Sequence, residues 1–256
     1  MKKKSIVSVI LSGILAFGLV GCGSTSNTAS SSGSNGNDKV IKIGVSPEPH
    51  KKIVDAAVPV LEKEGYRVEV TEFNDYVLPN TALSEGELDA NYFQHTPYLN
   101  EENKSRKLNL VSAGAIHLEP MGLYSKKIKN LDDLKEGATI AIPNDSSNEA
   151  RALKLLAANG LIEVKDGELV TPSDITSNPK NLKFTELEAA AVPRSIDDVD
   201  AAVINSNYAI PAGFNPTNDS IVIEDKDSEA AKPYANIVAV RSGDENSEKI
   251  KALVKA

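Results

Sequence analysis

The apolar and polar positions follow two different periods along residues 40–256. Mostly apolar, β-branched runs such as 40–45, with a break at Gly44, and 138–142 are typical of buried strands. Between such runs, apolar residues recur every three or four positions, as in 49–64 and 149–159, which predicts amphipathic helices. Strands that alternate with helices predict an α/β fold with mainly parallel sheets wrapped by helices.

The predicted elements form two series of about equal size, followed by one further strand and helix. Strands are expected at 40–45, 66–73, 88–93, 108–115, 121–124, 138–142, 182–187, 199–204 and 237–241. Helices are expected at 49–64, 79–84, 131–135, 149–159 and 189–196, from Thr96, and after Glu245. We therefore expect two lobes, residues 39–124 with 237–256 and residues 125–236. A ligand cleft is expected between them, beyond the carboxyl ends of strands.

The first 22 residues have the pattern of an export signal. Three lysines precede an apolar run at 6–20, and the small residue Gly21 lies just before Cys22. A basic segment and a short apolar run of this kind predict a cleaved signal peptide over residues 1–21. Cys22 is the single cysteine of the chain, so it cannot form an internal disulfide. The pattern resembles a bacterial lipobox, in which this cysteine is lipidated; an ordinary signal with an incidental cysteine is the alternative.

Residues 22–38 contain almost no side chains that could enter a core, because Ser, Gly, Asn and Thr dominate. Such a composition is typical of a flexible linker. A linker of this length would hold a globular body on the order of 20 Å from a membrane surface. The N-terminal pattern therefore predicts a protein of the cell membrane, anchored by a lipid on Cys22 and exposed on the extracytoplasmic face.

Composition and motifs exclude several classes of function. The net charge of −8 argues against nucleic-acid binding, because phosphates need a basic surface. The sequence contains no Gly-x-Ser-x-Gly elbow, no P-loop and no dinucleotide fingerprint, and residues 39–256 contain no cysteine. We therefore expect a binding protein and not an enzyme, with no cofactor.

The aromatic residues are few and unevenly placed. Of the seven Tyr and five Phe in the chain, five lie within residues 73–98, namely Phe73, Tyr76, Tyr92, Phe93 and Tyr98. Their clustering beside a predicted strand end indicates a cleft wall that covers an apolar ligand group. Phe73 is better explained as a core residue. So is one of the adjacent pair Tyr92 and Phe93, because neighbours on a strand point to opposite sides.

The segment 143–151 joins a predicted strand to a predicted helix. Ser146 and Glu149 have the spacing of a capping box, so the helix is expected to begin at Ser146, with Arg151 about one turn inside. Free amides and a guanidinium at a helix start would suit a ligand carboxylate. A capped helix with a solvated arginine is an equal alternative.

Three asparagines are weaker candidates for contacts with a ligand. Asn205 and Asn207 follow the predicted strand 199–204, where their amides could bind an ammonium or a carboxylate, or could simply cap a helix. Asn236 precedes the strand 237–241, in the expected crossover between the lobes.

The three histidines could belong to a metal site only if the fold brought them together. They are His50, His95 and His117, and Glu119 lies close to the last of them. Zinc needs about four such ligands. None of the histidines has close ligand spacing such as His-x-x-x-His. We therefore expect no metal site.

Several segments together resemble the NlpA family of methionine-binding lipoproteins, which are substrate-binding subunits of ABC importers. The segments are 80–99, which contains Gln94-His95, and 116–125, 143–153, 203–209 and 234–241. The resemblance runs from about residue 40 to the end of the chain. It implies a two-lobed periplasmic-binding-protein-like fold that closes on free methionine, with L-methionine as the favoured ligand. The closed form would then deliver methionine to a permease and its ATPase.

The resemblance also implies roles for individual residues. Those expected around the thioether side chain are Tyr76, Phe93, His95 and Tyr98. Those expected at the polar end of the ligand are Arg151 for the α-carboxylate, with Asn148 nearby, and Asn205 and Asn236. We expect a monomer. The chain departs from the family at its end, because members usually continue with more helix beyond the position of Ala256.

Three other functions stay open. A protein of the same architecture could bind a methionine-containing dipeptide or another small amino acid. A zinc- or manganese-binding lipoprotein would need His50, His95, His117 and Glu119 to converge. An exported enzyme would need a nucleophile and a base in contact within the cleft.

Overall fold

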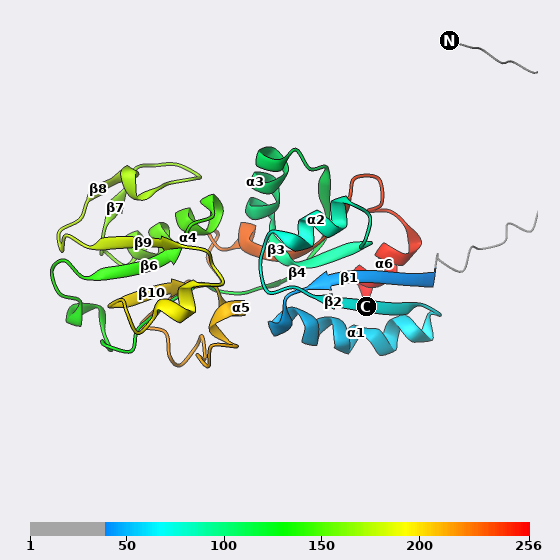
Figure 1. The fold of residues 1–256 in the computed structure, drawn as a ribbon, viewed down its shortest axis with the longest axis horizontal. Helices are drawn as coiled ribbons and strands as arrows, with labels where there is room; N and C mark the ends of the chain where they lie inside the picture. The colour runs from blue at the N-terminus through cyan, green and yellow to red at the C-terminus, as the bar shows by residue number, and fades with distance from the viewer. Residues whose placement is uncertain (1–38) are drawn as a thin grey trace, which may run out of the picture. The chain divides into compact units, whose positions relative to one another are not determined.

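The computed structural model describes residues 39–256, and its ribbon is drawn in Figure 1. The signal peptide, the lipidated Cys22 and the linker predicted for residues 1–38 lie outside the described residues. The described chain contains two five-stranded sheets and a separate two-stranded sheet.

The first sheet has the strand order β2-β1-β3-β12-β4. Its strands are β1 (Val40–Val45), β2 (Arg67–Glu72), β3 (Ala90–His95), β4 (Leu110–Leu118) and β12 (Ala235–Arg241). Its helices are α1 (Lys52–Lys63), which follows a π-helical turn at Pro47–Lys51, α2 (Leu78–Ser84), α3 (Thr96–Arg106) and α6 (Glu248–Lys255). β1 is parallel to β2 and β3, whereas β12 is antiparallel to β3 and β4.

The core of the first sheet follows from its apolar pattern. Ile41, Ile43 and Val45 of β1 have no exposed surface. Val54 and Leu61 of α1 lie two helical turns apart on one face and belong to the same buried cluster. The apolar face of β1 is therefore buried as predicted, whereas Lys42, between Ile41 and Ile43, is exposed.

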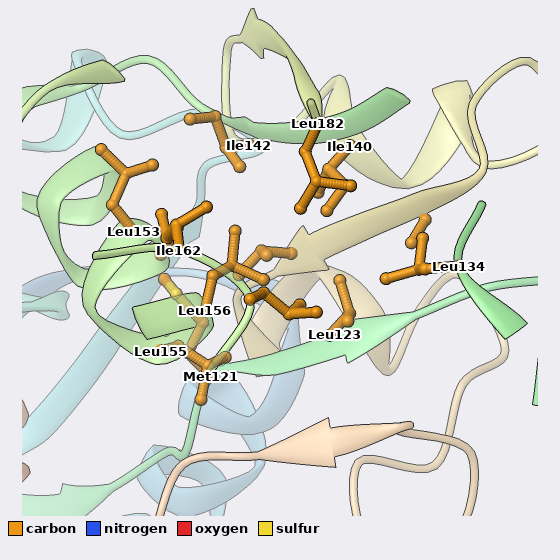
Figure 2. Close-up of a cluster of buried hydrophobic side chains, with 14 of the residues drawn as sticks. Met121, Leu123, Leu134, Ile140, Ile142, Leu153, Leu155, Leu156, Ile162 and Leu182 are labelled. Carbon is orange, nitrogen blue, oxygen red and sulfur yellow. The ribbon is translucent and has the colours of Figure 1, made fainter. Parts of the chain in front are cut away.

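The second sheet has the strand order β11-β5-β10-β6-β9. Its strands are β5 (Gly122–Tyr124), β6 (Thr139–Pro143), β9 (Lys183–Leu187), β10 (Ala201–Ile204) and β11 (Val222–Ile223). The remaining elements are α4 (Ser146–Ala158), α5 (Ser206–Ala209), the paired strands β7 (Glu163–Val164) and β8 (Ile175–Ser177), and 3-10 turns at Leu131–Asp133, Pro172–Asp174, Val192–Ser195 and Lys232–Tyr234. Leu153 and Leu156 of α4 pack in one buried cluster with Ile140 and Ile142 of β6 (Figure 2).

The α/β class and the two-lobed fold are confirmed. In each sheet four strands run in the same direction, and one strand, β12 or β5, runs antiparallel to both of its neighbours. The border expected after Tyr124 is wrong, because Gly122–Tyr124 pairs with β10 and β11 in the second sheet. The strands β7, β8 and β11 were not predicted, since segments of two or three residues carry no periodic pattern.

The chain passes between the two sheets twice, once between β4 and β5 and once between β11 and β12. Three strands end where a helix begins almost at once, because β3 leads into α3, β6 into α4 and β10 into α5. The fold therefore collects three strand ends and two crossovers as possible sites for ligand contacts. Within residues 39–256, no helix combines the length and the apolar character that crossing a membrane requires.

Candidate functional site

One pocket is bordered by residues of both lobes. Its empty volume, counted together with the space that opens to solvent, is about 340 Å³. The lining residues are Tyr76, Phe93, Gln94, His95, Tyr98, Glu119, Asn148, Arg151, Asn205, Ser206, Asn207 and Asn236. Every ligand residue predicted from the sequence is in this set, so the fold brings all of those candidates together.

The apolar side of the pocket is a wall of rings. The centroid of the Tyr76 ring lies 5.7 Å from Phe93, 5.6 Å from Tyr98 and 4.9 Å from Tyr208. These separations are typical of favourable aromatic pairs. The Tyr98 hydroxyl donates to the backbone oxygen of Tyr76 at 2.9 Å, which fixes the two rings relative to each other. Because Tyr208 belongs to the second lobe, the wall extends across both lobes.

The adjacent residues Tyr92 and Phe93 face opposite sides of β3, as expected. Tyr92 is 1% exposed and packs in the core of the first sheet. Phe93 is buried too, but it lines the pocket. The alternation of side chains along one strand thus gives one ring to the core and one to the ligand side.

His95 is held as a neutral imidazole with a defined tautomer. As the N-cap of α3, its Nδ1 accepts the backbone N–H of Tyr98 at 3.2 Å. Its Nε2 therefore carries the hydrogen and donates to Asn148 Oδ1 at 3.1 Å. Burial, helped by the nearby charge of Arg151, lowers the pKa of His95 to about 3. The ring therefore stays neutral in the ordinary pH range.

A chain of hydrogen bonds runs from Asp145 through Asn148 to Asn205. The Asp145 carboxylate accepts both the backbone N–H of Asn148 at 3.0 Å and its side-chain Nδ2 at 2.9 Å. The Asn148 Oδ1 atom consequently faces the other way and accepts from Asn205 Nδ2 at 2.8 Å. The Asn205 Oδ1 atom is buried and has no hydrogen-bond partner within residues 39–256.

The start of α4 differs from the prediction in one respect. The helix begins at Ser146 as expected, but its N-cap is Asp145, so the predicted capping box of Ser146 and Glu149 is wrong. An aspartate satisfies the free N–H of Asn148 better than a serine would, because its carboxylate carries a full charge. Burial raises the pKa of Asp145, and its hydrogen bonds with Asn148 and Ser147 oppose that rise. The anion at this helix start is therefore supplied by the protein itself.

Asn205 is the N-cap of α5 by position, but its side chain makes no capping hydrogen bond. The alternative that it serves only as a cap is therefore not what the structure shows. Its amide is instead used in the hydrogen-bond chain that reaches the pocket.

Arg151 is 4% exposed and is held on several sides. Its Nε donates to Glu224 Oε1 at 3.0 Å, and its Nη2 donates to Glu224 Oε2 and, at 2.8 Å, to the backbone oxygen of Glu119. The guanidinium carbon also lies 4.3 Å from the centroid of the Tyr234 ring. The bidentate edge expected for a ligand carboxylate thus faces Glu224, and Nη1 is the nitrogen that these bonds do not use.

Glu119 and two imidazoles form a compact group beside the pocket. Glu119 Oε1 accepts from His117 Nε2 at 3.0 Å and from Asn236 Nδ2 at 3.2 Å, and His50 Nε2 lies 3.2 Å from the same oxygen. Burial lowers the pKa of His50 more than Glu119 raises it. The donor atoms of His50, His117 and Glu119 lie within 4.8 Å of one another, so these three residues could hold a metal ion. His95 faces Asn148 instead, so the four-ligand convergence required by the zinc or manganese alternative does not occur.

A buried amide network lies behind the aromatic wall. Gln94 Nε2 donates to Asn80 Oδ1 at 2.7 Å and to Asn91 Oδ1 at 2.8 Å, and Asn80 Nδ2 donates back to Gln94 Oε1 at 3.0 Å. Asn80 and Asn91 have no exposed surface. Such a satisfied network fixes the position of β3 and therefore of Phe93 and His95.

A sequence model described as NlpA lipoprotein matches residues 41–256 of this chain. The chain belongs to the NlpA lipoprotein family. A Salmonella typhi family relative, D-methionine-binding lipoprotein MetQ, is 48% identical over 221 residues, which cover 84% of this chain and 80% of the relative. Lipoproteins of this family therefore share nearly the whole described fold with this chain.

Solved structures agree with this assignment. The crystal structure of the methionine binding protein MetQ is 45% identical, with a TM-score of 0.81 over 85% of this chain and 89% of that one. A nutrient binding protein from Burkholderia cenocepacia bound to methionine is 50% identical, with a TM-score of 0.78 over 84% of this chain and 90% of that one.

Asn207, one of the weaker candidates from the sequence, lines the pocket, and so do Gln94, Glu119 and Ser206, which were not predicted as ligand residues. Glu119 lies in the crossover between β4 and β5. The crossover argument that selected Asn236 did not reach it, because this crossover was expected after Tyr124. Glu224, which pairs with Arg151, had no local signal, because it follows a strand of only two residues.

Proposed function

We propose that this chain is the substrate-binding lipoprotein of an ABC importer and that it captures methionine in the pocket between the lobes. The observation that carries the proposal is the convergence of an aromatic wall and a set of charged and amide groups in one small pocket. The printed names of relatives that bind methionine support the same ligand class. No bond of the ligand would be made or broken.

The two sides of the pocket suit the two ends of methionine. A thioether gains about 0.3 to 1.5 kcal/mol from contact with an aromatic ring, and Tyr76, Phe93 and Tyr98 offer three rings close together. At the other end, the Nη1 edge of Arg151 would meet the α-carboxylate. Neutral His95 would pack against the apolar part without a charge to repel it.

Binding would also stabilise the closed arrangement of the lobes. Tyr76 and Asn236 come from the first sheet's lobe, whereas Arg151 and Asn205 come from the second, so a ligand in contact with all of them would bridge the two. A ligand that contacts both lobes shifts a hinge equilibrium toward the closed state. The closed form would then dock on a permease with its ATPase, and a lipid on Cys22 would hold the protein at the extracytoplasmic face of the membrane.

Thermal unfolding of the purified chain, freed of bound ligand by unfolding and refolding, tests the ligand. The series contains L-methionine, D-methionine, glycyl-methionine, other amino acids, and zinc with and without a chelator. Ligand at a thousand times its dissociation constant should add about 4 kcal/mol of stability, which shifts the Tm by several degrees. Stabilisation by methionine is the expected result. A response only to glycyl-methionine would identify a dipeptide binder, and a response only to zinc would sink the proposal and point to His50, His117 and Glu119.

A further inference from the structure

Three side chains with metal-binding atoms meet beside the pocket, and only two of them are close in the sequence. His50 lies in the π-helical turn Pro47–Lys51, His117 in β4, and Glu119 in the crossover that follows. Their donor atoms lie within 4.8 Å of one another. Two imidazoles and one carboxylate, with one position left open, are a complete protein ligand set for Zn²⁺. The fold therefore builds a ligand set that the sequence spacing did not predict.

His50 is the member of this group whose polar atoms lack partners. Its ring is buried, with 1% exposed, yet neither Nδ1 nor Nε2 has a hydrogen-bond partner among residues 39–256. Nε2 lies 3.2 Å from Glu119 Oε1, but the two atoms do not have hydrogen-bond geometry. A buried polar atom without a partner costs free energy, and native structures contain few of them. A cation bound at Nε2 would supply the missing partner.

The separations between the three side chains suit one metal ion. In a tetrahedral site with bonds of about 2.0 to 2.1 Å, the ligand atoms are about 3.4 Å apart. The Nε2 atoms of His117 and His50 lie 3.0 Å and 3.2 Å from Glu119 Oε1. The two imidazole rings are 5.2 Å apart between centroids and meet at 75°, so they approach from different directions instead of stacking. Small side-chain rotations would therefore place one ion between all three.

The neighbours of the three side chains leave the required atoms available. The Tyr92 hydroxyl contacts His117 Nδ1. Because a hydroxyl both donates and accepts, it can accept the hydrogen of Nδ1 when Nε2 binds a metal. Asn236 Nδ2 donates to Glu119 Oε1 at 3.2 Å, which orients the carboxylate, and Oε2 has no partner among the described residues.

The charges around the group allow a dication to bind. The guanidinium of Arg151 contacts the backbone oxygen of Glu119, but it is paired with the carboxylate of Glu224, which offsets its repulsion of a bound ion. Glu119 itself adds a negative charge to the ligand set, and the whole chain has a net charge of −8. Neither the local nor the overall charge therefore opposes a divalent cation.

We propose that His50 Nε2, His117 Nε2 and a carboxylate oxygen of Glu119 bind one divalent transition-metal ion, with zinc as the favoured ion. Imidazole ligands select zinc and its neighbours over magnesium and calcium, which prefer oxygen ligands. Three protein ligands leave one coordination position for water. The site excludes His95, whose Nε2 contacts Asn148. The inference goes beyond the proposed function and does not depend on it.

Zinc and cobalt titrations of the full chain test the site. The chain carries Cys22→Ser and no histidine tag, so that neither a free thiol nor added imidazoles compete for the ion. Calorimetry should give one zinc ion per chain, which a chelator removes and an excess of magnesium does not displace. Cobalt absorbs visible light strongly in a tetrahedral site and weakly in an octahedral one, and the strong bands are expected here.

Variants assign the ion to the three residues. His50→Gln, His117→Gln and Glu119→Gln should each weaken zinc binding about 100-fold or more and remove the cobalt bands, because each replaces a ligand by a neutral amide. Tyr92→Phe keeps the ring but removes a hydrogen bond to a ligand, which should weaken zinc binding about 10- to 100-fold. His95→Gln removes the remaining histidine of the chain and is the matched control, so zinc affinity should not change.

The outcomes separate this inference from the proposed function. The metal site is overturned if zinc does not bind, or if it binds His117→Gln as tightly as the parent chain; methionine binding then stands or falls by its own test. Zinc binding that the variants lose, in a chain that does not bind methionine, would support the site and overturn the proposed function. Should the variants fail to fold, as judged by circular dichroism, the cobalt spectrum of the parent chain decides, and weak octahedral bands overturn the site.

Discussion

The two sides of the pocket are built in different ways. On the aromatic side, Phe93, His95 and Tyr98 come from one short segment at the junction of β3 and α3. On the polar side, Asn148, Arg151 and Asn205 come from two separate strand-to-helix junctions. Asn148 is held locally by Asp145, whereas Arg151 and Asn205 are oriented by partners far along the chain. The aromatic side thus depends mainly on local backbone geometry, whereas the polar side adds long-range hydrogen bonds and a charge pair.

The difference is clearest at the two helix starts. The start of α3 is capped by His95, which is itself a pocket residue, so the cap and the binding surface are one group. The start of α4 is capped by Asp145, which does not line the pocket but sets the orientation of Asn148, which does. A substitution on the aromatic side should therefore act directly, and one on the polar side should act through a neighbour.

The largest effect is expected when the polar side loses its charge pair. Arg151→Ala should abolish measurable methionine binding. It should also lower the free energy of unfolding by about 3 kcal/mol, because the Glu224 carboxylate, which is only 14% exposed, loses its cationic partner. Calorimetry and urea unfolding measure the two losses.

A second substitution separates these two effects. Arg151→Ala with Glu224→Gln should recover much of the stability and none of the binding. Arg194→Ala removes an exposed arginine and serves as the control. Methionine binding retained in Arg151→Ala would show that the polar side does not need this guanidinium.

On the aromatic side, Phe93→Ala should cost about 3 to 5 kcal/mol of stability, since the ring is buried. It should weaken methionine binding by only about 2- to 10-fold, because one ring-to-thioether contact is lost. Phe73→Ala is the matched control, as that ring packs in the first lobe outside the pocket. The control should lose stability but keep its affinity, and an equal affinity loss in both variants would contradict the direct role of Phe93.

The pH dependence of the free energy of unfolding tests the protonation state of His95, the ring at which the aromatic and polar sides of the pocket meet. Below pH 6.5 the unfolded chain binds a proton at His95, whereas the folded chain does so only near its pKa of about 3. The unfolded state thus holds more protons in this window, so stability falls as pH falls. From pH 7 to pH 5 the His95 contribution amounts to roughly 2 kcal/mol.

The variant His95→Gln isolates that contribution. Urea unfolding between pH 7 and pH 5 measures the loss of stability in both proteins. The variant should lose less stability on acidification than the wild-type chain, and the difference should equal the His95 contribution. His50, whose pKa is also lowered, contributes equally to both proteins and cancels in the difference. Parallel pH curves would mean that His95 can be protonated in the folded chain.

The smallest effect is expected from a change that breaks the hydrogen-bond chain and keeps the helix cap. Asp145→Asn leaves a good N-cap on α4, so the free energy of unfolding should change by about 1 kcal/mol or less. Methionine affinity should fall about tenfold, because Asn148 loses its charged anchor and keeps only the hydrogen bond from His95 to orient its amide. Asp133→Asn, at a capping position of an exposed 3-10 turn, should leave affinity unchanged. An unchanged affinity in Asp145→Asn would show that Asn205 keeps its orientation without this anchor.

Sequence reasoning succeeded where a pattern is local. The strand at Val40–Val45 and the body of α4 follow from apolar periodicity and from breaker residues, which act within a few positions. The aromatic cluster at 73–98 likewise pointed to the wall that the structure contains. The sheet membership of Gly122–Tyr124 could not be predicted in this way, because three residues fit either sheet and only their pairing decides.

The sequence by itself determined the α/β class, the positions of most strands and helices, and the residue types available at their ends. Local hydrogen bonding and apolar burial encode those features. Only the tertiary structure decided that Glu224 holds Arg151, that Asp145 and not Ser146 caps α4, and that Glu119 lies in the pocket. Those features depend on which charged and amide groups meet after the chain has crossed twice between its two sheets, and no local pattern records such meetings.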